Sequence, residues 1–131
     1  MTDADRSRRI AAAWRSLDGL SVGDALGETF FLHHETVRRR IEARALPTGP
    51  ARWTDDTAMA ISVVEVLERF GRIEQDELAR LFGRRFAKEP QRGYGSGAFD
   101  ILDKLDRGMD WRAVSPAVFG GTGSMGNGGA M

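Results

Sequence analysis

Residues 53–70 read WTDDTAMAISVVEVLERF, and this stretch decides the fold class. Thr54, Asp55 and Asp56 open it, and Gly71 follows its last aromatic residue. Acidic side chains in a first turn favour the helix dipole, and glycine is common directly after a last turn. The residues between are strongly apolar. The stretch therefore predicts a buried helix that begins near Thr54 and ends at Gly71.

Apolar residues recur at helical spacing on both sides of this stretch. They fall on one face of a helix in each of three further segments: Ile10, Ala13, Trp14 and Leu17; Leu78, Leu81, Phe82 and Phe86; and Phe99, Leu102 and Leu105. We expect these helices to end at Gly19, Pro90 and Gly108, because glycine and proline interrupt helices. No segment alternates apolar and polar residues as a strand does, so the sequence predicts a compact all-α protein.

The bulk composition allows a packed core and excludes several classes of site and partner. The chain has 131 residues, of which 41% are hydrophobic and 29% charged, and its formal net charge is zero. Zero net charge gives no reason to expect a nucleic acid duplex as partner. Without cysteine there are no disulfides and no thiolate metal sites. The longest apolar run, residues 58–64, is too short to cross a membrane, so we expect a cytoplasmic protein.

Thr54, Asp55 and Asp56 form the first of three clusters that could carry chemistry. A hydroxyl and two adjacent carboxylates are oxygen ligands, which Mg²⁺ and Mn²⁺ prefer. At a helix start, the three side chains could fan toward one point in a cleft. The same residues also suit an N-cap followed by an acidic first turn. Both interpretations can hold together, because a metal ligand can also cap a helix.

Asp24 is the centre of the second cluster. It lies between Gly23 and Gly27 in the otherwise small and apolar segment 20–31. Two glycines four residues apart would let another backbone come close if the segment is helical. A buried carboxylate needs a partner. Asp24 therefore either supports a metal ligand through a hydrogen bond or caps a helix.

The third cluster is the glycine-rich end of the chain, with glycines at positions 120, 121, 123, 126, 128 and 129. Consecutive amides in such a turn form a concave anion site, and Ser124 and Asn127 add neutral polar contacts. The segment is neither a P-loop nor a dinucleotide fingerprint, since no Gly-Lys-Ser/Thr follows and no strand leads into it. A flexible tail is the alternative. Because such a loop needs a following element to hold its shape, we expect Met131 to lie inside a domain.

Together and in this order, the clusters resemble the ADP-ribosylglycohydrolase family. The matching pieces are 19–27 (GLSVGDALG), 53–60 (WTDDTAMA), 93–97 (GYGSG) and 123–131 (GSMGNGGAM). Each is a weak or moderate signal alone, but their order across nearly the whole chain is specific. The resemblance implies a compact all-α fold, in which residues 1–131 are the N-terminal portion of a single domain whose C-terminal portion is absent.

The resemblance also implies a centre of two divalent ions, Mg²⁺ or Mn²⁺. Thr54, Asp55 and Asp56 would be its N-terminal ligands, and Asp24 would support them without binding metal directly. The ions would hold the ribose hydroxyls and orient a water, and nearby carboxylates would stabilise an oxocarbenium-like transition state. Asp55 or Asp56 would help to activate that water as catalytic residues. The diphosphate and proximal ribose of ADP-ribose would lie against a loop made of Gly123, Ser124, Met125, Gly126 and Asn127.

Two departures from the family pattern bear on activity. Many relatives carry a glutamate four residues after the second glycine of the first motif, where this chain has Phe31, and the nearest acid is Glu28. The family also completes its metal site with a C-terminal Asp-x-Asp-Thr motif, which does not occur in residues 1–131. The first departure puts linkage preference in question, and the second leaves half of the metal ligands outside this chain.

The sequence therefore predicts a metal-dependent hydrolase whose full-length form removes an ADP-ribosyl group from a protein or a small molecule. We expect the 131-residue chain itself to be inactive, because three oxygen ligands on one side do not hold two ions tightly. One alternative is a non-catalytic module that binds ADP-ribose or a nucleotide. Another is a helical interaction fragment whose exposed apolar surface aggregates or recruits a partner.

Overall fold

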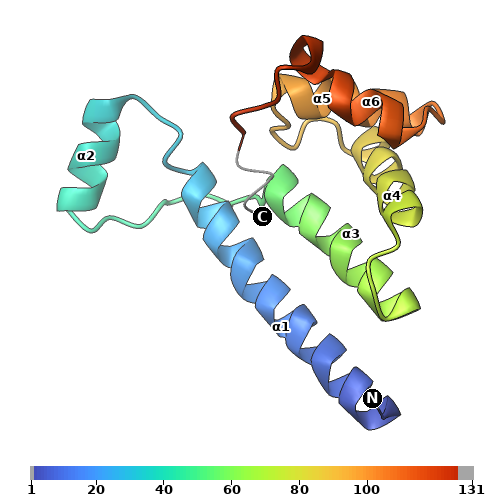
Figure 1. The fold of residues 1–131 in the computed structure, drawn as a ribbon. Coiled ribbons are helices and arrows are strands. Elements are labelled where there is room, and N and C mark those ends of the chain that lie inside the picture. The colour runs from blue at the N-terminus through green and yellow to red at the C-terminus, as the bar shows by residue number, and fades with distance from the viewer. Residues whose placement is uncertain (1, 127–131) are drawn as a thin grey trace.

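The computed structural model describes residues 2–126 as a set of helices joined by loops (Figure 1). The helices are α1 (Asp3–Glu28), α2 (His34–Glu42), α3 (Asp55–Phe70), α4 (Gln75–Lys88), α5 (Ser96–Asp106) and α6 (Trp111–Ala117), followed by the 3₁₀ turn η1 (Val118–Gly121). No β-strand occurs between residues 2 and 126, which confirms the predicted all-α class. Within the same residues, no helix is both long and apolar enough to cross a membrane.

α3 begins and ends where its sequence predicts. Thr54 has an extended backbone, and its hydroxyl accepts a hydrogen bond from the Asp56 amide, so Thr54 is the N-cap. Gly71 ends the helix with a φ of 73°, in the left-handed region that glycine enters without strain. α3 lies between α1 and α4 (Figure 1). It contributes the largest group of buried residues: Thr57, Ala58, Ser62, Val64 and Val66.

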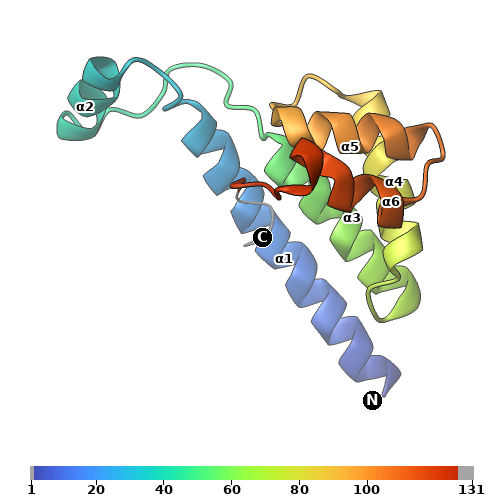
Figure 2. The same cartoon turned by 45° about the horizontal axis from the view of Figure 1, so that its top comes forward.

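α1 is longer than the sequence predicts. It continues past Gly19 to Glu28, so the expectation that Gly19 ends the helix is wrong. A glycine inside a helix costs about 1 kcal/mol relative to alanine. Packing of α1 along α3 offsets that cost (Figure 2), and Leu17 of α1 is buried. Beyond the helix's own backbone, no described atom lies within 4 Å of a Cβ placed on Gly19, Gly23 or Gly27, so the anticipated close approach of another backbone is not seen.

The packing of α4 against α5 sets the position of the loop between them. Gly83 of α4 is buried, and a Cβ there would lie only 2.7 Å from the Asp106 amide nitrogen. The ring of Phe86 packs edge-on against Tyr94 and Phe99, with centroids 5.1 Å and 4.7 Å away. These contacts position the α4–α5 loop beside the N-terminus of α3. The Asp55 amide there donates a hydrogen bond to the Arg92 carbonyl of the loop at 2.9 Å.

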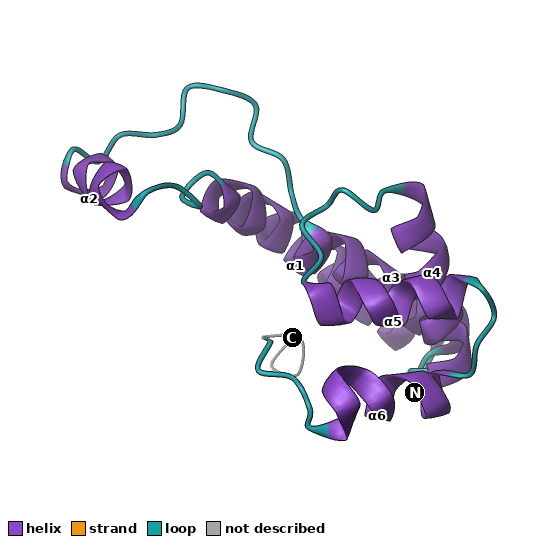
Figure 3. Cartoon of the chain, turned by 90° about the horizontal axis from the view of Figure 1, so that it is seen from above, coloured by secondary structure: helices purple, strands orange, loops and turns teal. Residues whose placement is uncertain are grey.

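α2 stands apart from the other helices. Figure 3 places it at one end of the molecule, with α5 and α6 toward the other. None of its residues is buried. α2 therefore adds little to the core that positions the N-terminus of α3.

Candidate functional site

Three segments of the chain meet at the N-terminus of α3. Asp24 comes from the last turns of α1, residues 54–57 open α3, and Arg92 and Gly93 come from the α4–α5 loop. Thr54, Asp55 and Asp56 are half-buried, and Thr57 is only 2% exposed. The three predicted ligand residues therefore lie in a sheltered place.

Asp24 caps α3 from the neighbouring helix. Its carboxylate accepts hydrogen bonds from the amide and the hydroxyl of Thr54, both at 2.7 Å. It also accepts from the amide and the hydroxyl of Thr57, at 3.2 Å and 2.5 Å. Three of these donors share Oδ2 and one reaches Oδ1, so of the about four lone-pair positions of an ionised carboxylate only one, on Oδ1, is left. Asp24 therefore has little left with which to bind a cation directly.

All the amides at the start of α3 have partners. The first N–H groups of a helix lack intrahelical acceptors and need other partners. Asp24 accepts from the amides of Thr54 and Thr57, the Arg92 carbonyl accepts from Asp55 at 2.9 Å, and the Thr54 hydroxyl accepts from Asp56 at 3.3 Å. With these donors satisfied, this helix start has no free amide to offer an anion. What it presents to a ligand is the carboxylates of Asp55 and Asp56.

The carboxylates at the site differ in their electrostatics. Burial tends to raise the pKa of Asp24, but the hydrogen bonds from Thr57 and Thr54 outweigh burial and lower that pKa. Burial raises the pKa of Asp55, and the negative charges of Asp56 and Asp24 add to the rise. In residues 2–126, no Lys, Arg or His nitrogen lies within 4 Å of the Asp55 or Asp56 carboxylate. A cation placed beside these two carboxylates would therefore be stabilised.

The donor set fits one side of a hard-cation site. The Thr54 hydroxyl donates its proton to Asp24 and accepts from the Asp56 amide, which leaves one of its two lone pairs for a ligand bond. Asp55 and Asp56 add carboxylate oxygens, and Mg²⁺ and Mn²⁺ prefer such ligands. Among the described residues, no three His, Cys, Asp or Glu side chains gather closely enough to hold a metal by themselves. Residues 2–126 thus offer part of a coordination sphere.

Comparison with known proteins places the chain in a family. The sequence profile of the ADP-ribosylglycohydrolases matches residues 2–131. The chain belongs to the ADP-ribosylglycohydrolase family. ADP-ribosylhydrolase ARH3 of Xenopus tropicalis is 36% identical over 126 residues, covering 88% of this chain and 36% of that protein. The human protein of the same name is 34% identical over 130 residues, with 88% and 36% covered.

The similarity extends over only part of these relatives. ADP-ribosylhydrolase ARH3 of Bos taurus is 40% identical over 142 residues, covering 98% of this chain and 39% of that protein. The chain therefore spans a little over a third of the length of the relatives it matches. No solved structure gives a significant match to this ADP-ribosylglycohydrolase chain.

The predicted substrate loop lies only partly within the described residues. Gly123, Ser124, Met125 and Gly126 are described, and Asn127 lies outside the described residues. The side chain of Met125 is fully exposed, and the hydrogen bond within the loop is local, from the Gly126 amide to the Ser124 hydroxyl at 3.0 Å. No hydrogen bond joins described residues of this loop to the start of α3. Its role in binding stays a prediction.

Arg92 is not among the site residues that the sequence predicts, yet it contacts the residue before the N-cap of α3. Its side chain donates to the Trp53 carbonyl at 3.1 Å, and its guanidinium lies 3.6 Å from the centroid of the Trp53 ring. The family motif begins one residue later, at Gly93, so the resemblance pointed to this loop without identifying the arginine. No periodicity in the sequence relates Arg92 to Trp53, because 39 residues separate them.

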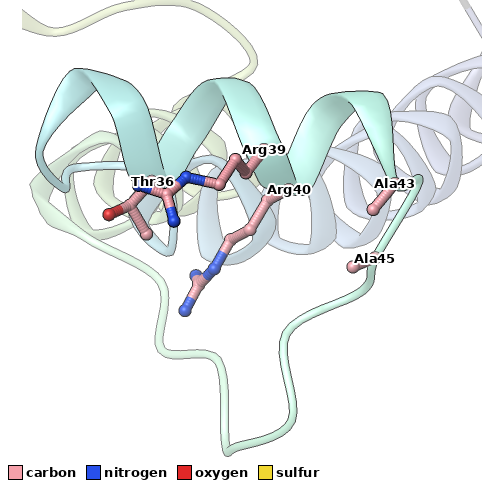
Figure 4. Close-up of a pocket in the computed structure, with 5 residues that line it drawn as sticks. All are labelled: Thr36, Arg39, Arg40, Ala43 and Ala45. Atoms are coloured by element: carbon pink, nitrogen blue, oxygen red, sulfur yellow. The ribbon is translucent and has the colours of Figure 1, made fainter.

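A basic hollow lies away from the start of α3. It has a volume of about 250 Å³ and is lined by Thr36, Arg39, Arg40, Ala43 and Ala45 (Figure 4). Arg40 is held beside the hollow, since its Nη1 donates to the Thr29 carbonyl at 3.1 Å. None of the predicted site residues of this ADP-ribosylglycohydrolase chain lines the hollow. This hollow and the acidic cluster at the start of α3 are therefore separate features.

Proposed function

We propose that this chain supplies one side of the divalent-cation site of a hydrolase that cleaves the glycosidic bond of ADP-ribosylated substrates. The observation that carries the proposal is the geometry of Asp55 and Asp56. They open α3 in a sheltered place, without a cationic partner among the described residues. Ionised carboxylates of like charge are costly to hold together unless a cation offsets their repulsion. Membership of the ADP-ribosylglycohydrolase family supports the same function.

Each residue at the start of α3 has a distinct role in the proposal. Thr54, Asp55 and Asp56 would hold Mg²⁺ or Mn²⁺ through oxygen atoms. Asp24 accepts the Thr54 hydroxyl proton and so orients the remaining Thr54 lone pair outward. This is the supporting role expected of a residue behind a metal ligand. Asp55 or Asp56 would also help to activate a water molecule, as a catalytic residue.

The cation supplies the Lewis-acid part of the chemistry. A pair of divalent ions, when bound, polarises the groups it contacts and lowers the pKa of water. The substrate would be an ADP-ribosylated protein or small molecule, because the relatives that match the chain are named ADP-ribosylhydrolases. The loop from Gly123 to Asn127 would contact the diphosphate and proximal ribose. The cytoplasmic location remains a prediction.

Phe31 bears on the linkage that is cleaved. It stands where many relatives have glutamate, and its side chain is 84% exposed. A phenylalanine neither donates nor accepts a proton, so any acid–base role at this position is lost. We therefore expect a linkage preference that differs from that of relatives with the glutamate.

Hydrolysis by the full-length protein that contains this chain tests the proposal. We expect ADP-ribose release from an ADP-ribosylated peptide in Mg²⁺ or Mn²⁺, and none in EDTA. Asp55→Asn and Asp56→Asn should each lower the rate by more than the roughly 10- to 100-fold typical of residues behind a ligand. Asp18→Asn changes an exposed acid on α1 and serves as control. Full activity in EDTA would contradict the proposal.

The 131-residue chain alone gives a second test. We expect no ADP-ribose release from it, because the three oxygen ligands at the start of α3 complete only part of a coordination sphere. Calorimetry with ADP-ribose, with and without Mg²⁺, separates the enzyme from a binding module. Cation-independent binding of ADP-ribose, together with a full-length protein that shows no turnover, would favour the module.

A further inference from the structure

We propose that Arg92 is a positioning residue for the cation site. Its side chain fixes Trp53, directly before the N-cap of α3, so that the Asp55 and Asp56 carboxylates point to a common ligand. The inference rests on the proposed cation binding and goes beyond it, because Arg92 lies outside the motifs that carry the family resemblance.

Arg92 contacts both Trp53 and Asp55, the residues on either side of the N-cap Thr54. The guanidinium donates from Nη1 to the Trp53 carbonyl at 3.1 Å and covers the Trp53 ring at 3.6 Å from its centroid. The Arg92 carbonyl accepts the Asp55 amide at 2.9 Å. A single residue of the α4–α5 loop therefore holds the residue before the N-cap and the residue after it.

Arg92 is itself held in place. Its Nε and Nη2 donate to the two carboxylate oxygens of Glu89 at 3.0 Å and 2.7 Å, and its side chain is 19% exposed. This two-point pairing fixes the plane of the guanidinium, and a lysine ammonium has no such plane. The third nitrogen is then aimed at the Trp53 carbonyl. These contacts with Glu89 and Trp53 therefore require the planar guanidinium of arginine as well as its positive charge.

Arg92 and Asp24 hold the same turn from two different elements. Asp24, on α1, binds Thr54 and Thr57, whereas Arg92 binds Trp53 and Asp55. Gly93 continues the loop with a φ of 96°, and a Cβ there would lie 3.6 Å from an Asp55 carboxylate oxygen. Loss of the Arg92 side chain would free Trp53, and it would leave both the Asp24 anchor and the main-chain hydrogen bond from the Asp55 amide intact. The fold should persist while the carboxylates lose their fixed direction.

Terbium binding to the full-length protein that contains this chain tests this inference without using activity. Tb³⁺ is a hard cation that takes oxygen ligands, and Trp53 lies next to Thr54 as a sensitiser of its luminescence. The dissociation constant comes from the titration midpoint, so a changed Trp53 environment does not distort it. Arg92→Ala and Arg92→Lys should each weaken binding by about tenfold or more. Circular dichroism checks that each variant is folded, and the lysine variant decides if the alanine variant is not.

Arg112 provides a matched control. It covers the ring of Trp111 at 4.5 Å and pairs with Asp76 and Asp110, far from the start of α3 in sequence. Arg112→Ala should leave the terbium constant unchanged. Wild-type affinity in both Arg92 variants would overturn the inference while leaving the proposed function intact. Failure of the wild-type full-length protein to bind Tb³⁺ would overturn both. The two failures are distinguishable, because only the second removes the luminescence signal of the wild type.

Discussion

At the scale of single residues, Asp24 links the end of α1 to the start of α3. One carboxylate accepts four hydrogen bonds from two threonines, and no buried side-chain polar atom in the described residues lacks a partner. Such saturation explains how an acid flanked by small residues is tolerated. Because the Thr54 hydroxyl donates to Asp24, the hydroxyl is fixed and its remaining lone pair has a defined direction. The same contacts therefore serve helix capping and the proposed site.

Asp24→Asn tests how much this cap contributes to stability. The asparagine amide group is a donor where Asp24 offers an acceptor, so at least one donor of Thr54 or Thr57 loses its partner. We expect the free energy of unfolding to fall by about 1 to 3 kcal/mol. Urea denaturation followed by circular dichroism measures it. Asp18→Asn, on the exposed side of α1, should change stability little, and equal stabilities of the two variants would contradict the capping role.

At the scale of helices, two glycines of this chain have opposite consequences. A Cβ on Gly83 would lie 2.7 Å from the Asp106 amide nitrogen, in backbone that is unable to move aside cheaply. A Cβ on Gly19 meets nothing beyond α1 itself within 4 Å. The first glycine permits the close packing of α4 and α5, and the second only weakens α1.

Alanine at these two positions should therefore shift stability in opposite directions. Gly83→Ala is expected to lower the free energy of unfolding by about 1 to 3 kcal/mol through overpacking. Gly19→Ala should raise it by up to about 1 kcal/mol, because alanine favours the helix and meets no neighbour. Thermal unfolding of both variants beside the wild type checks the pair. A stabilising Gly83→Ala would mean that α4 and α5 are packed less closely than described.

The ion pair between α3 and α4 gives a pH dependence at the same scale. Glu77 lies 2.8 Å from Arg69, and the hydrogen bond from Arg80 lowers the pKa of Glu77 below its ordinary value of 4.5. A lowered carboxyl pKa means that its stabilisation is present above about pH 4.5 and is lost as pH falls through the folded value. Glu77→Gln should therefore lower stability at pH 7, and the loss should be smaller at pH 3. Unfolding at both pH values measures this, with the exposed Glu68→Gln as control.

The helices could be predicted from sequence where their signals are local. Thr54 and Gly71 bound α3 by their own backbone preferences, so the element follows from nearby residues. α1 could not be bounded this way, because packing against α3 outweighs the local preference of Gly19. The site shows the same limit. Asp24 and Thr54 are separated by 30 residues, and only the family resemblance joined them before the structure did.

At the scale of the whole molecule, the chain exposes more surface than its mass requires. A compact monomer of 14.4 kDa exposes about 6,800 Å², whereas this chain exposes 9194 Å². Part of the excess is apolar and lies toward the end of α1. Val22 is 69% exposed there and Phe31 is 84% exposed. Exposed apolar surface of this kind favours association with another surface.

Purified as 131 residues, the chain should therefore self-associate as its concentration rises. Light scattering is expected to give an apparent mass above 14.4 kDa that grows with concentration. Val22→Ser combined with Phe31→Ser should reduce the effect, because both changes remove apolar area at the end of α1. Met109→Ser, at an exposed site in the α5–α6 loop, tests whether any loss of apolar surface suffices. If the double variant and Met109→Ser reduce association equally, the apolar surface at the end of α1 is not the site of self-association. If only the double variant reduces it, this surface is the contact between copies of the chain.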